Sequence, residues 1–143
     1  MKKLLVWLLY LGLVGCASVG NLDKLRVENR QNILRIQIGM TKSEVLNIMG
    51  NKFATDVYLR NLSGSNQFTV NNPYRSEILQ GKDKVFEIIY YYTDVKKTQQ
   101  YFGAIFSVQD DELTPLVFDN GKLIGWGWSF LQDNVQKYEL RMR

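Results

Sequence analysis

The chain opens with a short, nearly continuous apolar run. Lys2 and Lys3 precede residues 4–14 (LLVWLLYLGLV), which are apolar except for Gly12 and the hydroxyl of Tyr10. A basic start followed by an apolar run that is too short to span a bilayer is typical of a secretory signal peptide. Beyond residue 24 the apolar positions become periodic, which indicates one folded domain after the signal.

Helical spacing predicts two helices in the first part of this domain. Residues 25–36 form a narrow apolar edge, and Gly39 ends the pattern. A second, short helix is expected to begin at residue 41, because Thr41-Lys42-Ser43-Glu44 has the form of a capping box, and to end at Gly50. The first edge consists of Leu25, Asn29, Ile33 and Ile36, and the second of Val45, Leu46, Ile48 and Met49.

Alternation with a period of two replaces the helical spacing after Gly50. Residues 53–59 predict a half-buried strand in which Phe53, Val57 and Leu59 share one face. Residues 61–83 are polar and contain two glycines and a proline, so they are expected to form a long loop. Residues 85–95 (VFEIIYYYTDV) give the strongest strand pattern, and because both faces are largely apolar we expect a central strand or an exposed aromatic face.

The pair Asn120-Gly121 separates the apolar segments 116–118 and 123–128 and predicts a type I′ hairpin, since both turn residues must accept a positive φ. Gly125 and Gly127 leave backbone uncovered, which lets a helix or a partner approach closely. Residues 128–138 predict a closing helix. Together these elements predict an α+β domain, with two N-terminal helices packed on one face of a three- to four-stranded antiparallel sheet and a short C-terminal helix.

The amino-acid composition limits the kinds of functional site that the chain can form. The 143 residues are 45% hydrophobic and 22% charged, which fits one globular domain and argues against disorder of the whole chain. The chain has no histidine and one cysteine, so it excludes a disulfide framework, a Cys/His zinc site and a Ser-His-Asp triad within the chain.

The only cysteine lies where a lipidated residue is expected. Leu13-Val14-Gly15-Cys16 looks like the bacterial lipobox, in which the cysteine is acylated and becomes the mature N-terminus. An ordinary signal peptide is the alternative. We therefore expect a signal peptide over residues 1–15, a lipidated tether over 16–24 and one domain over 25–143. Ala17, where an Asp would signal retention in the inner membrane, points to the periplasmic side of the outer membrane.

Charge argues against nucleic acid as a partner. Removing residues 1–15 takes away Lys2 and Lys3 and lowers the formal net charge from +4 to +2, with no long basic run left. The pairs Lys82/Lys84 and Lys96/Lys97 offer a modest attraction to anionic lipid, although solvated surface lysines are the simpler interpretation.

The carboxylates predict neither a metal site nor an acid/base pair. Asp110, Asp111 and Glu112 are consecutive and lack calcium-loop spacing, so a solvated acidic turn is expected. The other isolated carboxylates are interpreted as ordinary surface charge. We expect no metal, no cofactor, no small-molecule substrate and no enzymatic activity. The isolated carboxylates are Asp56, Glu77, Glu87 and Asp94.

Two segments carry a resemblance to known lipoproteins. Residues 38–45 (IGMTKSEV) with Ile48-Met49-Gly50 resemble the G-M-T-x-x-x-V…L-G signature of the BamE (SmpA/OmlA) outer-membrane lipoprotein family. Asn72-Pro73-Tyr74, ahead of the strand at 86–92, resembles that family's Asp-Pro-Phe loop, and the similarity covers residues 29–93. Residues 113–118 (LTPLVF) and 121–127 (GKLIGWG) are similar to a further group of bacterial lipoproteins that carries the same G-M-T helix.

This resemblance implies a non-catalytic domain that works through contacts in envelope or outer-membrane protein assembly. Carried over by motif, the partner-binding surface would lie at Asn72, Pro73 and Tyr74. An exposed aromatic face would add Trp126 and Trp128, although packing in the core is an equal alternative. The rival function is a periplasmic binding module, similar to β-lactamase inhibitor proteins, that acts on a soluble enzyme.

Overall fold

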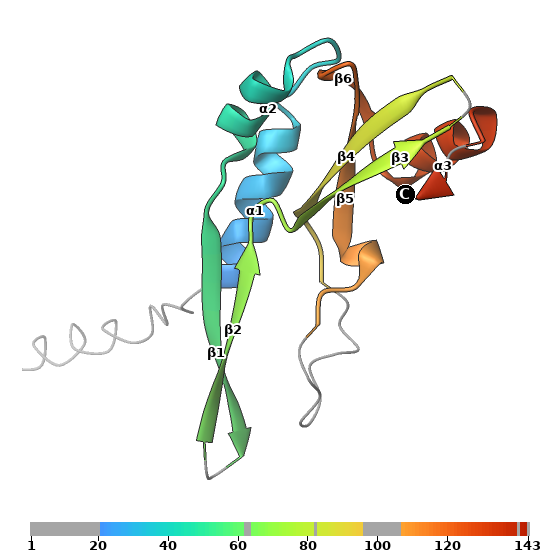
Figure 1. The fold of residues 1–143 in the computed structure, drawn as a ribbon. Helices are drawn as coiled ribbons and strands as arrows, with labels where there is room; N and C mark the ends of the chain where they lie inside the picture. The colour runs from blue at the N-terminus through green and yellow to red at the C-terminus, as the bar shows by residue number, and fades with distance from the viewer. Residues whose placement is uncertain (1–20, 62–63, 82, 96–106, 140, 143) are drawn as a thin grey trace, which may run out of the picture.

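The computed structural model describes residues 21–61, 64–81, 83–95, 107–139 and 141–142 (Figure 1). The predicted signal peptide, Cys16 and the lysines at 82, 96 and 97 lie outside the described residues. Within the described ranges, no helix combines the length and apolar character that crossing a membrane requires. The helices are α1 (Asn21–Ile33), α2 (Lys42–Met49) and α3 (Trp128–Lys137), and the strands are β1 (Phe53–Asn61), β2 (Gly64–Asn71), β3 (Arg75–Gln80), β4 (Val85–Tyr92), β5 (Leu113–Asp119), β6 (Lys122–Trp126) and β7 (Arg141–Met142).

The strands form two separate antiparallel sheets. The main sheet has the order β6-β5-β4-β3-β7, in which β7 is only two residues long, and β1 pairs with β2 alone. The predicted α+β class and antiparallel pairing are confirmed, and β4 is the central strand of the main sheet. The prediction of a single sheet is wrong, because β1 and β2 form their own hairpin, which projects beside α1 in Figure 1.

Both faces of the main sheet are covered by helices. Ile89 and Tyr91 of β4 belong to a cluster with Val45 and Met49 of α2. The alternate β4 residues, among them Tyr90, pack in a second cluster with the helix α3. Helix α2 therefore lies on one face of the sheet and α3 on the other, which explains why both faces of β4 are apolar. The expected placement of both N-terminal helices on one face holds only in part, because Leu22 and Leu25 of α1 join the cluster on the α3 side, whereas Ile33 at the end of α1 packs against the cluster on the α2 side.

Helix α1 begins earlier than the sequence pattern predicts. Residues 21–24, expected as part of the tether, are helical, and Leu22 is only 1% exposed. The helix starts here because Asp56 of β1 accepts hydrogen bonds from the backbone N–H groups of Asn21 (2.9 Å) and Leu22 (3.0 Å). Such an acceptor satisfies helix-terminal N–H groups from a distant part of the chain. Ile36 is buried as expected but lies beyond the end of α1.

The capping box of α2 is confirmed. The Thr41 hydroxyl accepts from the backbone N–H of Glu44 at 3.3 Å, and the Glu44 carboxylate accepts from the N–H of Thr41 at 2.8 Å. The bond from the Thr41 N–H, together with one that the Thr41 hydroxyl donates to the same carboxylate at 2.7 Å, lowers the pKa of Glu44. Gly50 follows the helix with φ +79°, a conformation that favours glycine.

The predicted loop over 61–83 is wrong, because β2 and β3 occupy most of it. Its polar composition reflects a hairpin with one solvated face: Gln67 and Thr69 are exposed, whereas Val70 is fully buried. The strand β1 is present. At its start, however, the buried face is the one that carries Ala54 rather than the one that carries Phe53. Phe53 is 72% exposed, and its neighbour Ala54 packs against the core.

The predicted C-terminal hairpin, closing helix and close approach at Gly125 are confirmed, whereas no atom lies within 4 Å of a Cβ position at Gly127, where a close approach is also expected. Asn120 and Gly121 have φ values of +50° and +73°, and they join Asp119 to its cross-strand partner Lys122, as a type I′ hairpin requires. The helix α3 follows, with Leu131 buried. Gly125 allows the close approach that the sequence predicts, since a Cβ atom at this position would lie 2.6 Å from the ring of Phe130.

We expect Gly125→Ala to destabilise the protein by about 1–3 kcal/mol, because the added methyl group overlaps the Phe130 ring. Urea unfolding of the detergent-solubilised protein measures this change. The exposed Ser129→Ala in the same helix should change stability by less than about 0.5 kcal/mol. Combining Gly125→Ala with Phe130→Leu should cost less than the sum of the two single changes; strict additivity would contradict the contact.

Candidate functional site

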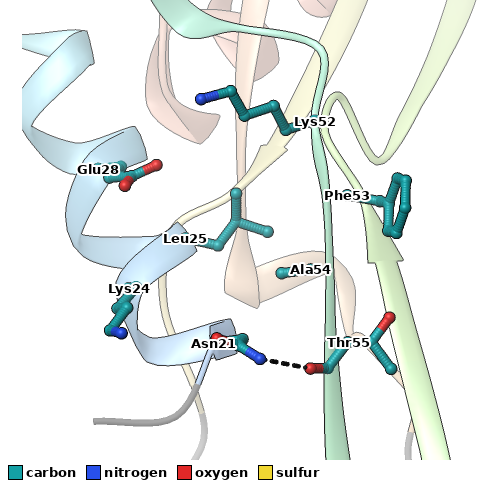
Figure 2. A pocket seen from close by; sticks show the side chains of 8 residues that line it. All are labelled: Asn21, Lys24, Leu25, Glu28, Lys52, Phe53, Ala54 and Thr55. Carbon is teal, nitrogen blue, oxygen red and sulfur yellow. Dashed lines mark hydrogen bonds between the residues drawn. The ribbon is translucent and has the colours of Figure 1, made fainter.

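A groove lies between the first turns of α1 and the start of β1. Its volume is about 410 Å³, and Figure 2 shows its lining side chains between the helix and the strand. The helix contributes Leu25 to its floor, and the strand contributes Ala54. It is lined by Asn21, Lys24, Leu25, Glu28, Lys52, Phe53, Ala54 and Thr55.

Hydrogen bonds hold the two sides of this α1/β1 groove in place. The Asn21 side chain donates from Nδ2 to the backbone oxygen of Thr55 at 2.9 Å (Figure 2), next to the backbone bonds that Asp56 accepts. Leu25 is 5% exposed and joins the core cluster that includes Val70. The groove is therefore built on fixed elements rather than on a loop.

Charged side chains line the groove, but none of them is paired with a second described group as general acid/base or nucleophilic catalysis requires. Lys52 reaches toward α1 and Glu28 toward the strand in Figure 2, and neither Lys24 nor Lys52 forms an ion pair with another described residue. The Thr55 hydroxyl is hydrogen-bonded to that of Thr69 at 2.8 Å. The described residues contain no group of three or more acidic or cysteine side chains placed to hold a metal. An apolar floor between two amines suits binding more than catalysis.

Asn72, predicted to contact a partner, instead joins buried elements of the fold. It is 5% exposed, and its amide exchanges hydrogen bonds with that of Asn29 at 2.9 and 3.1 Å. Its Nδ2 also donates to the backbone oxygen of Met49 at 3.3 Å. The prediction that Asn72 contacts a partner directly is therefore wrong. Its buried side chain has a structural role, because it joins α1, α2 and the turn before β3.

Pro73 and Tyr74, the other two residues of this motif, are half-buried. The Asn72–Pro73 peptide bond is cis. The backbone N–H of Tyr74 donates to the backbone oxygen of Tyr90 at 2.8 Å, and this bond aligns the chain beside β4 at the start of β3. The exposed parts of Pro73 and Tyr74 leave a small surface at this turn.

Trp126 and Trp128 do not form one surface. Trp126 packs against the cluster on the α2 side of the sheet, whereas Trp128 packs on the α3 side. The Trp128 indole donates to the backbone oxygen of Leu113 at 2.7 Å, and its ring centroid lies 5.8 Å from that of Tyr90. The tyrosines of β4 are core residues: Tyr90 is 2% exposed, and Tyr91 is fully buried. An exposed aromatic face on β4 is therefore wrong.

The predicted acidic turn is a structured 3₁₀ turn (Asp110–Glu112), and its carboxylates are engaged rather than simply solvated. Asp110 pairs with Arg75 at 2.9 Å, and Glu112 is 2% exposed and accepts from the backbone N–H of Gln109 at 2.9 Å. Arg75 also lies 4.4 Å above the ring of Tyr90. Burial raises the pKa of Tyr90 to about 12.

Other charges interpreted as ordinary surface groups also have specific partners. Glu77 accepts from the Tyr90 hydroxyl at 3.1 Å, and Glu87 pairs with Lys42. Lys84, considered for lipid attraction, pairs with Asp119 at 2.6 Å. These contacts could not be predicted from the sequence, because each joins residues on different elements.

Sequence reasoning missed the groove residues Lys24, Lys52 and Phe53. The sequence pattern places Lys24 in the tether. It places Phe53 on the apolar face of the strand because of its hydrophobic side chain alone. The burial of Ala54 and the capping role of Asp56 fix the opposite orientation. A useful signal was the acidic Asp56, which shares the strand face of Ala54 and could cap a helix packed there.

A family model described as "Protein of unknown function (DUF3192)" matches residues 17–133 of the chain. No curated protein and no solved structure matches the chain. The family match covers both N-terminal helices, both sheets apart from β7, and the first half of α3.

We expect Asn72→Ala to lower stability by about 1–3 kcal/mol, because the Asn29 amide and the Met49 carbonyl lose a buried partner. The neighbouring Asn71→Ala is the matched control, since Asn71 is exposed, and it should cost less than about 0.5 kcal/mol. Urea unfolding followed by tryptophan fluorescence measures both changes. Equal effects of the two variants would argue against the structural role of Asn72.

Proposed function

The chain belongs to the DUF3192 family, and from this premise we propose that it is a lipid-anchored adaptor on the periplasmic side of the bacterial outer membrane. It binds an envelope protein, in envelope or outer-membrane protein assembly, and catalyses no reaction. The lipobox-like sequence ending at Cys16 and the resemblance of residues 29–93 to the BamE family support this proposal.

The observation that carries the proposal is the start of α1 at Asn21, five residues after Cys16. Five extended residues reach about 17 Å at most. The first turn of α1 is fixed to β1 through Asp56, so the folded domain has no long linker within the described residues to carry it away from the lipid. The α1/β1 groove opens at this same end of the helix.

Anchoring is the mechanism of the proposed adaptor. Confinement to a thin layer at the membrane raises the effective concentration of the domain toward any partner in that layer, so a weak contact suffices. The groove and the strand beside it offer such a contact: Lys24 and Lys52 flank the apolar floor, and Phe53, which is 72% exposed, extends from β1 on the side away from α1 (Figure 2). Exposed aromatic side chains on a rigid frame are typical anchors of protein interfaces.

Cys16→Ser should abolish incorporation of labelled palmitate and release the protein from the membrane fraction, because acyl chains at this residue supply the membrane affinity. Ala17→Asp is the matched variant: it should keep the label and move the protein to the inner membrane in a Gram-negative host. Palmitate labelling followed by membrane fractionation measures both effects. Labelling that persists in Cys16→Ser would disprove the anchor.

A photoreactive residue at Phe53 should crosslink to an envelope protein in intact cells, whereas the same probe at the exposed Gln132 of α3 should not. Mass spectrometry identifies the adducts. Adducts with lipid alone, or equal yields at both positions, would contradict an adaptor role for the groove. Recovery of a soluble periplasmic enzyme instead would favour the inhibitor-like function.

A further inference from the structure

The turn between α1 and α2 exposes two large apolar side chains. Leu34 is 85% exposed and Ile38 69% exposed, while Ile36 between them is 4% exposed. Leu34 and Ile38 each lie in a turn on either side of the buried Ile36, and both side chains face solvent. Single exposed apolar residues are common on protein surfaces. Two large exposed apolar side chains on either side of a buried residue are less common and suggest a binding surface.

The backbone of this turn is firmly held. Gly39 donates to the backbone oxygen of Leu123 at 2.8 Å, and Leu123 donates back to Met40 at 2.8 Å. Thr41 and Lys122 form an isolated antiparallel bridge beside this pair. The turn is thus attached to the outer edge of β6, and a surface that is ordered before binding loses less conformational entropy when it binds.

The exposed pair adjoins other apolar side chains. Ile33 precedes Leu34, and Met40 follows Ile38 by two residues; both pack against the same cluster as Trp126 of β6. Trp126 itself is half-buried. We call the surface formed by Leu34 and Ile38 the turn patch.

Positive charge lies at the rim of the turn patch. Residues 29–43 contain Arg30, Arg35 and Lys42 and no acidic residue. Arg30 donates to a backbone oxygen, and Lys42 is paired with Glu87.

Two rim cations remain uncompensated. Arg35 donates to the neutral Asn32 at 3.3 Å, and neither Arg35 nor the exposed Lys122 forms an ion pair with another described residue. Carboxylates on a partner would complement these two rim cations.

The position of the patch favours a protein over the membrane as its partner. Helix α1 has 13 residues and is therefore about 20 Å long. The chain enters from Cys16 at the N-terminal end of α1, whereas the turn patch lies past the C-terminal end, near β6 (Figure 1). The short tether therefore places the opposite end of the helix nearest to the lipid.

We propose that the turn patch binds a partner-protein segment in which apolar side chains are flanked by carboxylates. The apolar side chains of that segment would cover Leu34 and Ile38, and its carboxylates would meet Arg35 and Lys122. This inference rests on the proposed adaptor function and adds a second contact surface, at the end of α1 remote from the groove.

Photocrosslinking of the full-length lipidated protein in cells tests the proposal. The photoreactive probe is benzoylphenylalanine at Leu34 or Ile38, and the control position is the exposed Ser129 on the opposite side of the sheet. The expected result is a protein adduct at Leu34 and Ile38 only, whose crosslinked peptide contains apolar residues flanked by Asp or Glu. A lipid adduct, an adduct with a second copy of this chain, or a segment without carboxylates overturns the proposal.

Charge reversal then tests the rim. Binding of the synthetic crosslinked peptide to the purified full-length protein should weaken by about tenfold or more in Arg35→Glu combined with Lys122→Glu. A peptide with its carboxylates replaced by Lys should regain binding to that variant. Lys137→Glu, at the exposed end of α3 and outside both proposed surfaces, should leave the affinity unchanged; an equal loss there, or no loss in the double variant, overturns the assignment.

The controls separate the two proposals. If palmitate labelling at Cys16 and crosslinking at Phe53 succeed but Leu34 and Ile38 give no adduct, the turn patch is wrong and the adaptor function stands. If labelling and the Phe53 crosslink both fail, the adaptor function is wrong, and the turn-patch proposal that rests on it falls as well. Far-UV circular dichroism of each variant confirms that these exposed substitutions leave the fold intact.

Discussion

Burial of β4 on both faces is the constraint on which the rest of the structure depends. Its residues alternate between two clusters, so Ile89 and Tyr91 require α2 on one side while Ile88 and Tyr90 require α3 on the other. A strand that is apolar on both faces is stable in water only if both faces are covered. The order of the chain meets this requirement: β5 and β6 extend the sheet, and α3 packs on the face opposite to α2.

A second constraint lies where the polar groups at the end of β4 meet α1. Arg26 is 8% exposed; its guanidinium donates to the Tyr92 hydroxyl at 2.9 Å and lies 5.2 Å from the centre of that ring. Asn29 donates to the backbone oxygen of Tyr92 at 2.7 Å as well as pairing with Asn72. Buried polar groups are tolerated only when they are satisfied, so this network fixes the position of α1 relative to the sheet and to the turn before β3.

The sequence predicted those elements whose determinants are local. The capping box at Thr41, the positive-φ pair Asn120-Gly121 and the apolar alternation of 85–92 each act through neighbours a few residues apart, and each is confirmed. The β1–β2 hairpin was missed because its far half carries polar residues on a solvated face. The sequence between the two strands also lacks an Asn-Gly or Asp-Gly pair.

The candidate sites depended on tertiary contacts and were predicted less well. The motif that led to Asn72 identified an important residue but not its role, because only its pairing with Asn29, 43 positions earlier, shows that it is internal. The groove depends on Asp56 reaching the first turn of α1, which no local pattern reveals. The predicted apolar edge includes Ile36 but not Leu34 or Ile38, and only the folded turn shows that these two large apolar side chains are exposed beside it.

The attachment at the start of α1 also has a mechanical consequence. Any pull on the chain ahead of residue 21 acts on Asn21, whose backbone N–H and side chain are both bonded to β1. Three hydrogen bonds, to Thr55 and to the two Asp56 carboxylate oxygens, therefore share the load before the first turn of the helix can unwind. If the proposed anchor pulls on the chain, the load reaches the β1–β2 hairpin through these bonds before it reaches the contacts of Arg26 and Asn29 with β4.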